Sequence, residues 1–111
     1  MVDHIKLSII IPTKNEGKYI GRTIGQFEEY LGKYDLEVII SDADSKDETA
    51  AVVRGWQAKL GDRIKFIQSE GKQNIAIGRN LGAAQASGDI LFHTDADVHI
   101  QDKDRFFRYL L

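Results

Sequence analysis

The sequence predicts an α/β fold with a mostly parallel sheet of about four strands, and three observations lead to this prediction. Short apolar runs rich in β-branched residues alternate with longer segments of helical periodicity. The apolar runs are nearly continuous, as is typical of strands that helices cover on both faces. Glycines close the helical segments, at Gly32, Gly61 and Gly88. We therefore expect a Rossmann-like three-layer sandwich with strand order 3-2-1-4 and right-handed crossovers.

The first strand is expected over residues 6–11, and Pro12 is expected to end it. Thr13 and Glu16 then have the spacing of a capping box, which predicts a helix start. Apolar residues on one face of that helix are Ile20, Ile24, Phe27 and Leu31.

The second unit repeats this organisation. A strand is expected over residues 36–40, and Ser45 and Glu48 again have capping-box spacing. The helical stripe that follows, in which we expect Trp56 to be a core residue, consists of Val52, Val53, Trp56 and Leu60. A third strand is expected over residues 64–67.

The last two helices are expected to start at Asn74 and Asp102, and a fourth strand to span residues 90–92. The predicted core-facing residues of the third helix are Ile77, Leu81 and Ala84. In the last helix they are Phe106, Phe107 and Leu110, which we expect to lack a covering layer. With an unpaired fourth strand, they predict association into a dimer or larger oligomer.

Composition excludes several classes of function. The chain has 111 residues and a formal net charge of −2, which suits one domain over residues 1–111 and argues against nucleic-acid binding by bulk charge. It has no cysteine, so no disulfide or thiolate metal site is possible. No signal peptide and no apolar run of ~20 residues are present, which predicts a cytoplasmic protein without a membrane segment.

Two carboxylates follow the fourth predicted strand, Asp95 and Asp97, with one small residue between them. Side chains two residues apart on an extended chain point the same way, so this pair could hold a divalent cation. Strand order 3-2-1-4 places it beside residues 12–17, at the point where ligands of such sheets bind.

Four segments resemble motifs of the family 2 glycosyltransferases, which have the GT-A fold. They occur in the family's order and cover residues 7–16, 42–47, 77–82 and 88–97, the last containing the DXD motif. Family catalytic domains run to roughly twice this length, as do many single α/β domains. We therefore expect a truncated GT-A nucleotide-binding subdomain, the N-terminal nucleotide-sugar-binding half, without the half that carries the acceptor site and catalytic base.

The resemblance implies a site for a nucleotide-diphosphate sugar, UDP- or GDP-linked. The candidate residues of that site are Pro12, Thr13, Glu16, Asp42, Asp44, Arg79 and Asp95, of which Asp44 stands where family members often carry glycine. Among them Asp42 matches a base contact, Arg79 a residue near the nucleotide and Asp95 a ribose contact. Asp97, together with Asp95, matches the ligands of Mg²⁺ or Mn²⁺, hard cations that suit carboxylate and phosphate oxygens.

Other interpretations stay open at this stage. Asp42 could be a turn or capping residue, Glu16 could cap a helix, and Arg79 could be an ordinary surface residue. His93 and His99 are weak metal candidates, because neither has a second histidine at ligand spacing. The catalytic residues are unknown, and a non-catalytic nucleotide-binding module is the alternative function. A nucleotidyltransferase is disfavoured, because no glycine-rich basic loop follows the first strand.

Overall fold

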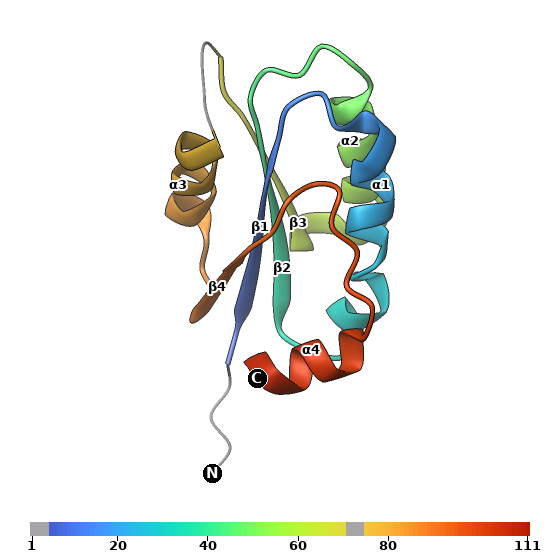
Figure 1. Cartoon of the computed structure of the whole chain (residues 1–111), viewed down its shortest axis with the longest axis vertical. Coiled ribbons are helices and arrows are strands. Elements are labelled where there is room, and N and C mark those ends of the chain that lie inside the picture. Colours follow the sequence, from blue (N-terminus) through green and yellow to red (C-terminus); the bar gives the residue numbers. More distant parts are fainter. Residues whose placement is uncertain (1–4, 71–74) are drawn as a thin grey trace.

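The computed structural model of the chain describes residues 5–70 and 75–111, so the helix cap expected at Asn74 lies outside the described residues. Its sheet has four parallel strands in the order β3-β2-β1-β4, as predicted (Figure 1). The strands are β1 (Leu7–Thr13), β2 (Leu36–Asp42), β3 (Ile64–Gln68) and β4 (Ile90–His93). Leu7 of β1 is paired with Leu36 on one side and with Ile90 on the other.

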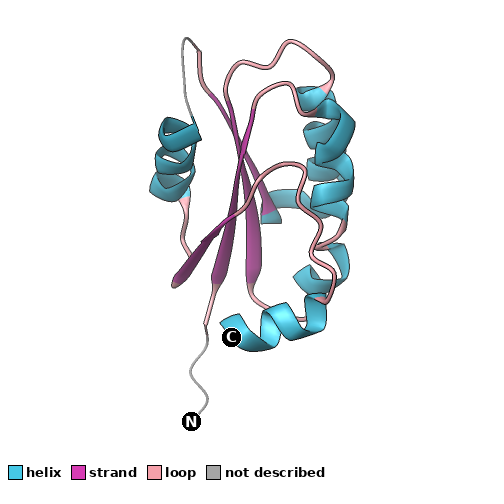
Figure 2. Cartoon of the chain, in the orientation of Figure 1, coloured by secondary structure: helices cyan, strands magenta, loops and turns pink. Residues whose placement is uncertain are grey.

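Helices cover both faces of the sheet, which gives the predicted three-layer sandwich (Figure 2). α1 (Gly17–Gly25) and α2 (Thr49–Leu60) lie on one face, and α3 (Ile75–Gln85) lies on the other. Short 3-10 turns, η1 (Glu28–Gly32) and η2 (Gly61–Arg63), follow α1 and α2. The last helix, α4 (Lys103–Leu110), lies near the start of β1, at the end of the sheet opposite the carboxyl ends of the strands.

The main core lies between the sheet and the α1–α2 layer. The predicted stripe of the first helix is buried there, although α1 ends at Gly25 and η1 carries its last member. Those buried residues are Ile20, Ile24, Phe27 and Leu31. Trp56 is partly buried and packs against this core, as do Val52 and Leu60.

Pro12 does not end the first strand, contrary to prediction. β1 continues to Thr13, and Pro12 is paired with Ser41 of β2. Thr94 N donates a hydrogen bond to Ile10 O, so the polar backbone groups of Ile10 face β4. Residues two positions apart on a strand face the same neighbour, so the nitrogen of Pro12 also faces the β4 side. Pairing between β1 and β4 stops at Ile10, so no interstrand hydrogen bond is lost through the missing N–H of Pro12.

Neither predicted capping box forms. The residues that precede α1 and α2, Glu16 and Glu48, make no capping hydrogen bond with their side chains. The side chain of Asp47 caps both helices instead, because it accepts hydrogen bonds from Gly17 N and from Thr49 N, each at 3.0 Å. The predicted cap of α4 is confirmed, since Asp102 accepts from Arg105 N.

The prediction for the buried face of α3 is wrong. Ile77, Leu81 and Ala84 are exposed, whereas Gly78 and Gly82 are buried. A Cβ at Gly82 would lie 2.5 Å from Ile10 Cγ2, so the absence of a side chain lets the helix approach β1.

The expectation that α4 lacks a covering layer is also wrong. Phe107 is fully buried, and its ring stacks on those of Tyr30 and Tyr34 at centroid distances of 4.7 and 5.2 Å. Tyr30 Oη donates to Asp104 Oδ1 at 2.8 Å, which ties η1 to α4. α4 therefore packs back onto the main core.

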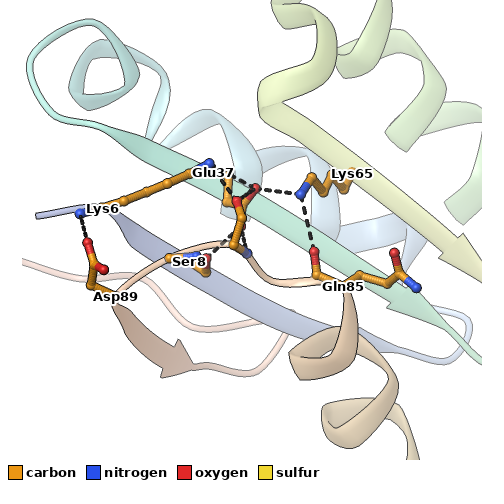
Figure 3. A network of polar contacts seen from close by, with 8 residues as sticks. Lys6, Ser8, Glu37, Lys65, Gln85 and Asp89 are labelled. Atoms are coloured by element: carbon orange, nitrogen blue, oxygen red, sulfur yellow. Dashed lines mark hydrogen bonds and ion pairs between the residues drawn. The ribbon is translucent and has the colours of Figure 1, made fainter.

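A cluster of polar side chains around Glu37 joins the connection between α3 and β4 to the sheet (Figure 3). Ser8 and Glu37 are the second residues of β1 and β2, so the cluster lies near the amino ends of these strands. Glu37 on β2 is 3% exposed, accepts from Ser8 Oγ at 2.6 Å and from Ser87 N at 2.8 Å, and pairs with Lys65 at 2.8 Å. Burial raises the pKa of Glu37, but these hydrogen bonds and the Lys65 charge outweigh it and lower the pKa to about 2.

Within residues 5–70 and 75–111, no helix has the length and apolar character needed to cross a bilayer.

Candidate functional site

A cleft of about 320 Å³ opens at the carboxyl ends of β1 and β2, beside the loop that follows β4. This is the position predicted from the strand order. Its lining residues are Pro12, Thr13, Lys14, Glu16, Ser41, Ala43, Gly78, Asp95, Ala96 and Asp97. Five of the predicted site residues are therefore brought together: Pro12, Thr13, Glu16, Asp95 and Asp97.

Two polar side chains, Thr23 of α1 and Gln26 directly after it, hydrogen-bond the backbone of the loop that contains Asp95 and Asp97. Thr23 Oγ1 donates to Ala96 O, and Gln26 Nε2 donates to Val98 O at 2.9 Å. Gln26 Oε1 in turn accepts from Ile100 N at 2.8 Å. Because Ala96 is anchored and buried, the side chains on either side of it, Asp95 and Asp97, remain exposed on the cleft.

Several acidic side chains lie near one another at this cleft. Desolvation, followed by the charges of Asp97, Asp47 and Asp95, raises the pKa of Glu16. Among the described residues, no group of three His, Cys, Asp or Glu side chains forms a complete metal-binding cluster, and His93 and His99 are exposed. Two exposed carboxylates in an acidic cleft fit a hard cation that completes its shell with phosphate and water oxygens.

Arg79 of α3 is directed to the same loop. Its guanidinium Nη2 lies 3.5 Å from Asp95 Oδ1, with both side chains about half exposed. Arg79 Nε is buried and has no hydrogen-bond partner in the described parts of the chain. The structure thus places Arg79 beside Asp95, although Arg79 does not line the cleft.

Asp42 is fully buried and does not line the cleft. Its Oδ1 accepts from Thr13 Oγ1 and Ser45 Oγ, each at 2.6 Å, and its Oδ2 accepts from Ser45 N at 3.0 Å. The carboxylate therefore links the end of β1 to the loop after β2, and Ser45 serves this turn and not a helix cap.

Asp44 stands in the left-handed region, with φ of +53°, and so does Asn15 of the neighbouring loop, at +54°. Asp and Asn tolerate this conformation better than other residues with side chains. The side chain of Asp44 is partly exposed, and its carboxylate pairs with Lys46 at 3.0 Å. Asn15 Oδ1 accepts from Lys46 N at 2.7 Å, which joins the two loops.

The site predicted from the sequence lacked Thr23 and Gln26 and five of the lining residues: Lys14, Ser41, Ala43, Gly78 and Ala96. Thr23 and Gln26 were detectable in principle, since they are polar residues next to the apolar stripe of the first helix. The structure buries both side chains. Ser41 also carried a signal, as a hydroxyl in an otherwise apolar strand. Lys14 gave none, because its ammonium is fixed by the Ala43 carbonyl of another loop.

Comparison with known sequences agrees with the resemblance described above. The model of the glycosyl transferase family 2 matches residues 8–106. The GalNAc(5)-diNAcBac-PP-undecaprenol β-1,3-glucosyltransferase of Campylobacter jejuni is 40% identical over 93 residues, which are 83% of this chain and 29% of that protein. Validoxylamine A glucosyltransferase of Streptomyces hygroscopicus is 37% identical over 94 residues, 83% of this chain and 22% of that protein.

Solved structures show the same fold. The mannosyltransferase PcManGT of Pyrobaculum calidifontis, in complex with GDP-Man and Mn²⁺, superposes with a TM-score of 0.83 at 27% identity over 94% of this chain and 31% of its own. TarS of Staphylococcus aureus in complex with UDP gives 0.64 at 25% identity, over 95% of this chain and 31% of its own.

The chain thus spans less than a third of the length of each of these four proteins. Its strand order, its cleft and these matches together lead to one assignment. The chain belongs to the glycosyl transferase family 2 and has the fold of the N-terminal part of a GT-A glycosyltransferase.

Proposed function

We propose that this chain binds a nucleoside diphosphate sugar together with a divalent cation, as the donor-binding part of a glycosyltransferase. The observation that carries the proposal is the joining, in one cleft, of the ends of β1 and β2 with the two exposed carboxylates after β4. Relatives of known structure support it, since one holds GDP-Man with Mn²⁺ and another holds UDP.

In this proposal the diphosphate end of the donor lies beside Asp95 and Asp97 and the nucleoside extends toward β1 and β2. Asp95 and Asp97 hold Mn²⁺ or Mg²⁺, with the remaining ligands from the diphosphate and water. When bound, the cation neutralises charge on the departing nucleoside diphosphate. Arg79 adds positive charge on the other side of Asp95.

Pro12, Thr13 and Glu16 form the wall against the nucleoside. The base contact predicted for Asp42 stays a prediction; the hydrogen bonds of Asp42 give it the further role of holding Thr13 and Ser45 in place. A nucleotide contact of Asp44 also stays a prediction; Asp44 follows Ala43 of the cleft wall, and its left-handed backbone shapes the loop. Transfer of the sugar also requires an acceptor site and a catalytic base, and the proposal assigns neither to a described residue.

Calorimetric titration of UDP and GDP, with and without Mn²⁺ or Mg²⁺, tests the proposal on the wild-type chain and on Asp97→Asn. We expect cation-dependent binding of one nucleotide, weakened by at least about 100-fold in the variant, because a direct ligand matters more than an outer-shell one. Asp62→Asn is the matched control, since Asp62 lies on η2, away from the cleft, and this variant should bind like the wild type.

Cation-independent binding, or equal binding by Asp97→Asn, would show that the DXD carboxylates do not hold a cation. A folded wild-type chain that binds neither nucleotide would contradict the donor-site proposal and favour a module without this activity.

A further inference from the structure

One buried polar group in the cleft wall is left without a partner. Ser41, the last residue but one of β2, is 1% exposed and lines the cleft. Its Oγ has no hydrogen-bond partner among the residues that the structure describes. A buried hydroxyl in this condition destabilises the folded chain, so it calls for an explanation.

Ser8, on the neighbouring strand β1, shows how such a hydroxyl is normally satisfied. Ser8 is also fully buried, but its Oγ donates to Glu37 and accepts from Gly88 N at 2.9 Å. In the part of the chain that the structure describes, Ser41 has no counterpart to these contacts at the cleft end of the sheet. The orphaned hydroxyl therefore coincides with the ligand cleft and not with the structural polar cluster.

Strand pleating separates Ser41 from the adjacent Asp42. Successive side chains of a strand point to opposite faces. Asp42 is turned to the face where Thr13 and Ser45 satisfy it, and Ser41 is turned to the face that α3 covers, where Gly78 also lines the cleft. Of these two β2 residues, only Ser41 lines the space that a ligand would fill.

The strand order fixes which part of a ligand Ser41 would meet. β1 lies between β2, which carries Ser41, and β4, which leads to Asp95 and Asp97. β2 and β4 are two interstrand spacings apart, about 10 Å. Ser41 therefore lies on the side of the cleft away from the strand that leads to the carboxylates, where the base of a bound nucleotide would reach. The cleft wall near Ser41 also includes Pro12, Ala43 and Gly78, small apolar surfaces against which a flat ring can lie.

We propose that the Ser41 hydroxyl is a base-recognition contact that hydrogen-bonds the edge of the nucleotide base. This inference rests on the proposed donor-binding function and adds a specificity residue to it. A hydroxyl can donate one hydrogen bond and accept others, so it matches the carbonyl and N–H groups on a uracil or guanine edge. Ligand binding then satisfies the group that the free protein leaves unpaired.

The test compares thermal stability and nucleotide affinity in Ser41→Ala. Removing an unpaired hydroxyl should leave the melting temperature unchanged or raise it, while binding of UDP or GDP with Mn²⁺ should weaken about tenfold. Ser41→Thr keeps a hydroxyl and should retain more affinity than Ser41→Ala. Ser8→Ala is the matched control, and it should lower the melting temperature without changing nucleotide affinity.

Inorganic diphosphate with Mn²⁺ serves as the probe without a base. Ser41→Ala should bind diphosphate as the wild type does, because the contact is to the base. Equal nucleotide affinity in wild type and Ser41→Ala, or an equal loss for diphosphate, would overturn the role of Ser41 and leave the donor site intact. A wild-type chain that binds no nucleotide would overturn both proposals.

Discussion

At the scale of single residues, Asp42 shows how a buried carboxylate organises a ligand cleft that it does not line. It accepts hydrogen bonds from Thr13 on β1 and from Ser45 in the loop after β2. Thr13 lines the cleft, so Asp42 controls the cleft wall indirectly. Ser45 in turn accepts from Asn15 N at 2.7 Å, which extends the connection to the loop before α1.

Asp42→Asn should lower the free energy of unfolding by about 1–3 kcal/mol, because an amide NH₂ replaces one acceptor and faces donors that then lack a partner. Urea unfolding followed by circular dichroism measures this. Asp44→Asn is the control, since asparagine also tolerates φ of +53° and the Asp44–Lys46 pair is exposed. Equal stability of the two variants would show that the Asp42 hydrogen bonds contribute little.

At the scale of elements, α3 approaches the sheet through glycines and not through its large apolar residues. Gly78 and Gly82 are buried, while Leu81 is 36% exposed. The close approach brings Gly78 to the cleft and Arg79 to Asp95. The distance between α3 and β1 therefore sets part of the site's geometry.

Gly82→Ala should destabilise the protein by about 1–3 kcal/mol, because the added methyl would meet Ile10 in a packed layer. Gly55→Ala in α2 is the matched control. Apart from the adjacent residues and the backbone of α2 itself, no atom of the described residues lies within 4 Å of the added Cβ, so the gain in helix propensity should stabilise the protein by up to about 1 kcal/mol. Thermal melts of both variants measure the contrast. Stabilisation by Gly82→Ala would mean that α3 is not held at this distance.

At the scale of the whole molecule, Glu37 joins several elements in one polar cluster. It lies on β2 and contacts Ser8 of β1, Lys65 of β3 and Ser87 before β4. The cluster connects segments that are distant along the chain, so its ionisation bears on the stability of the entire sheet.

The lowered pKa of Glu37, about 2 against an ordinary 4.5, predicts how stability depends on pH. The ionised carboxylate stabilises the fold fully above pH 4.5, and this contribution, on the order of 3 kcal/mol, is lost as the pH falls toward 2. Subtracting the unfolding free energy of Glu37→Gln from that of the wild type should give a difference that shrinks over this range. A difference that is constant with pH would contradict it.

Association through β4 is the second whole-molecule prediction. β4 is an edge strand of the described sheet, and Leu91 on it is 42% exposed. Exposed strand edges pair readily with other chains. Light scattering at rising protein concentration should show dimers or larger species, and Leu91→Lys should reduce them. A chain that stays monomeric at millimolar concentration would contradict this.

The sequence by itself determined the strand order, the apolar stripe of the first helix and the place of Asp95 and Asp97 at a strand end. These features depend on local periodicity and on general rules of parallel sheets, so they could be predicted without coordinates. Four motifs in the order typical of family 2 glycosyltransferases also indicate the family from the sequence alone.

Only the tertiary structure decided which face of α3 is buried, which residue caps α1 and α2, and how α4 is covered. Asp47 caps two helices because two loops meet in space, and Phe107 is buried because α4 returns to Tyr30 and Tyr34. The unpaired hydroxyl of Ser41 is likewise a property of its surroundings. Such features depend on distances between elements that are far apart in sequence, and local pattern does not encode these distances.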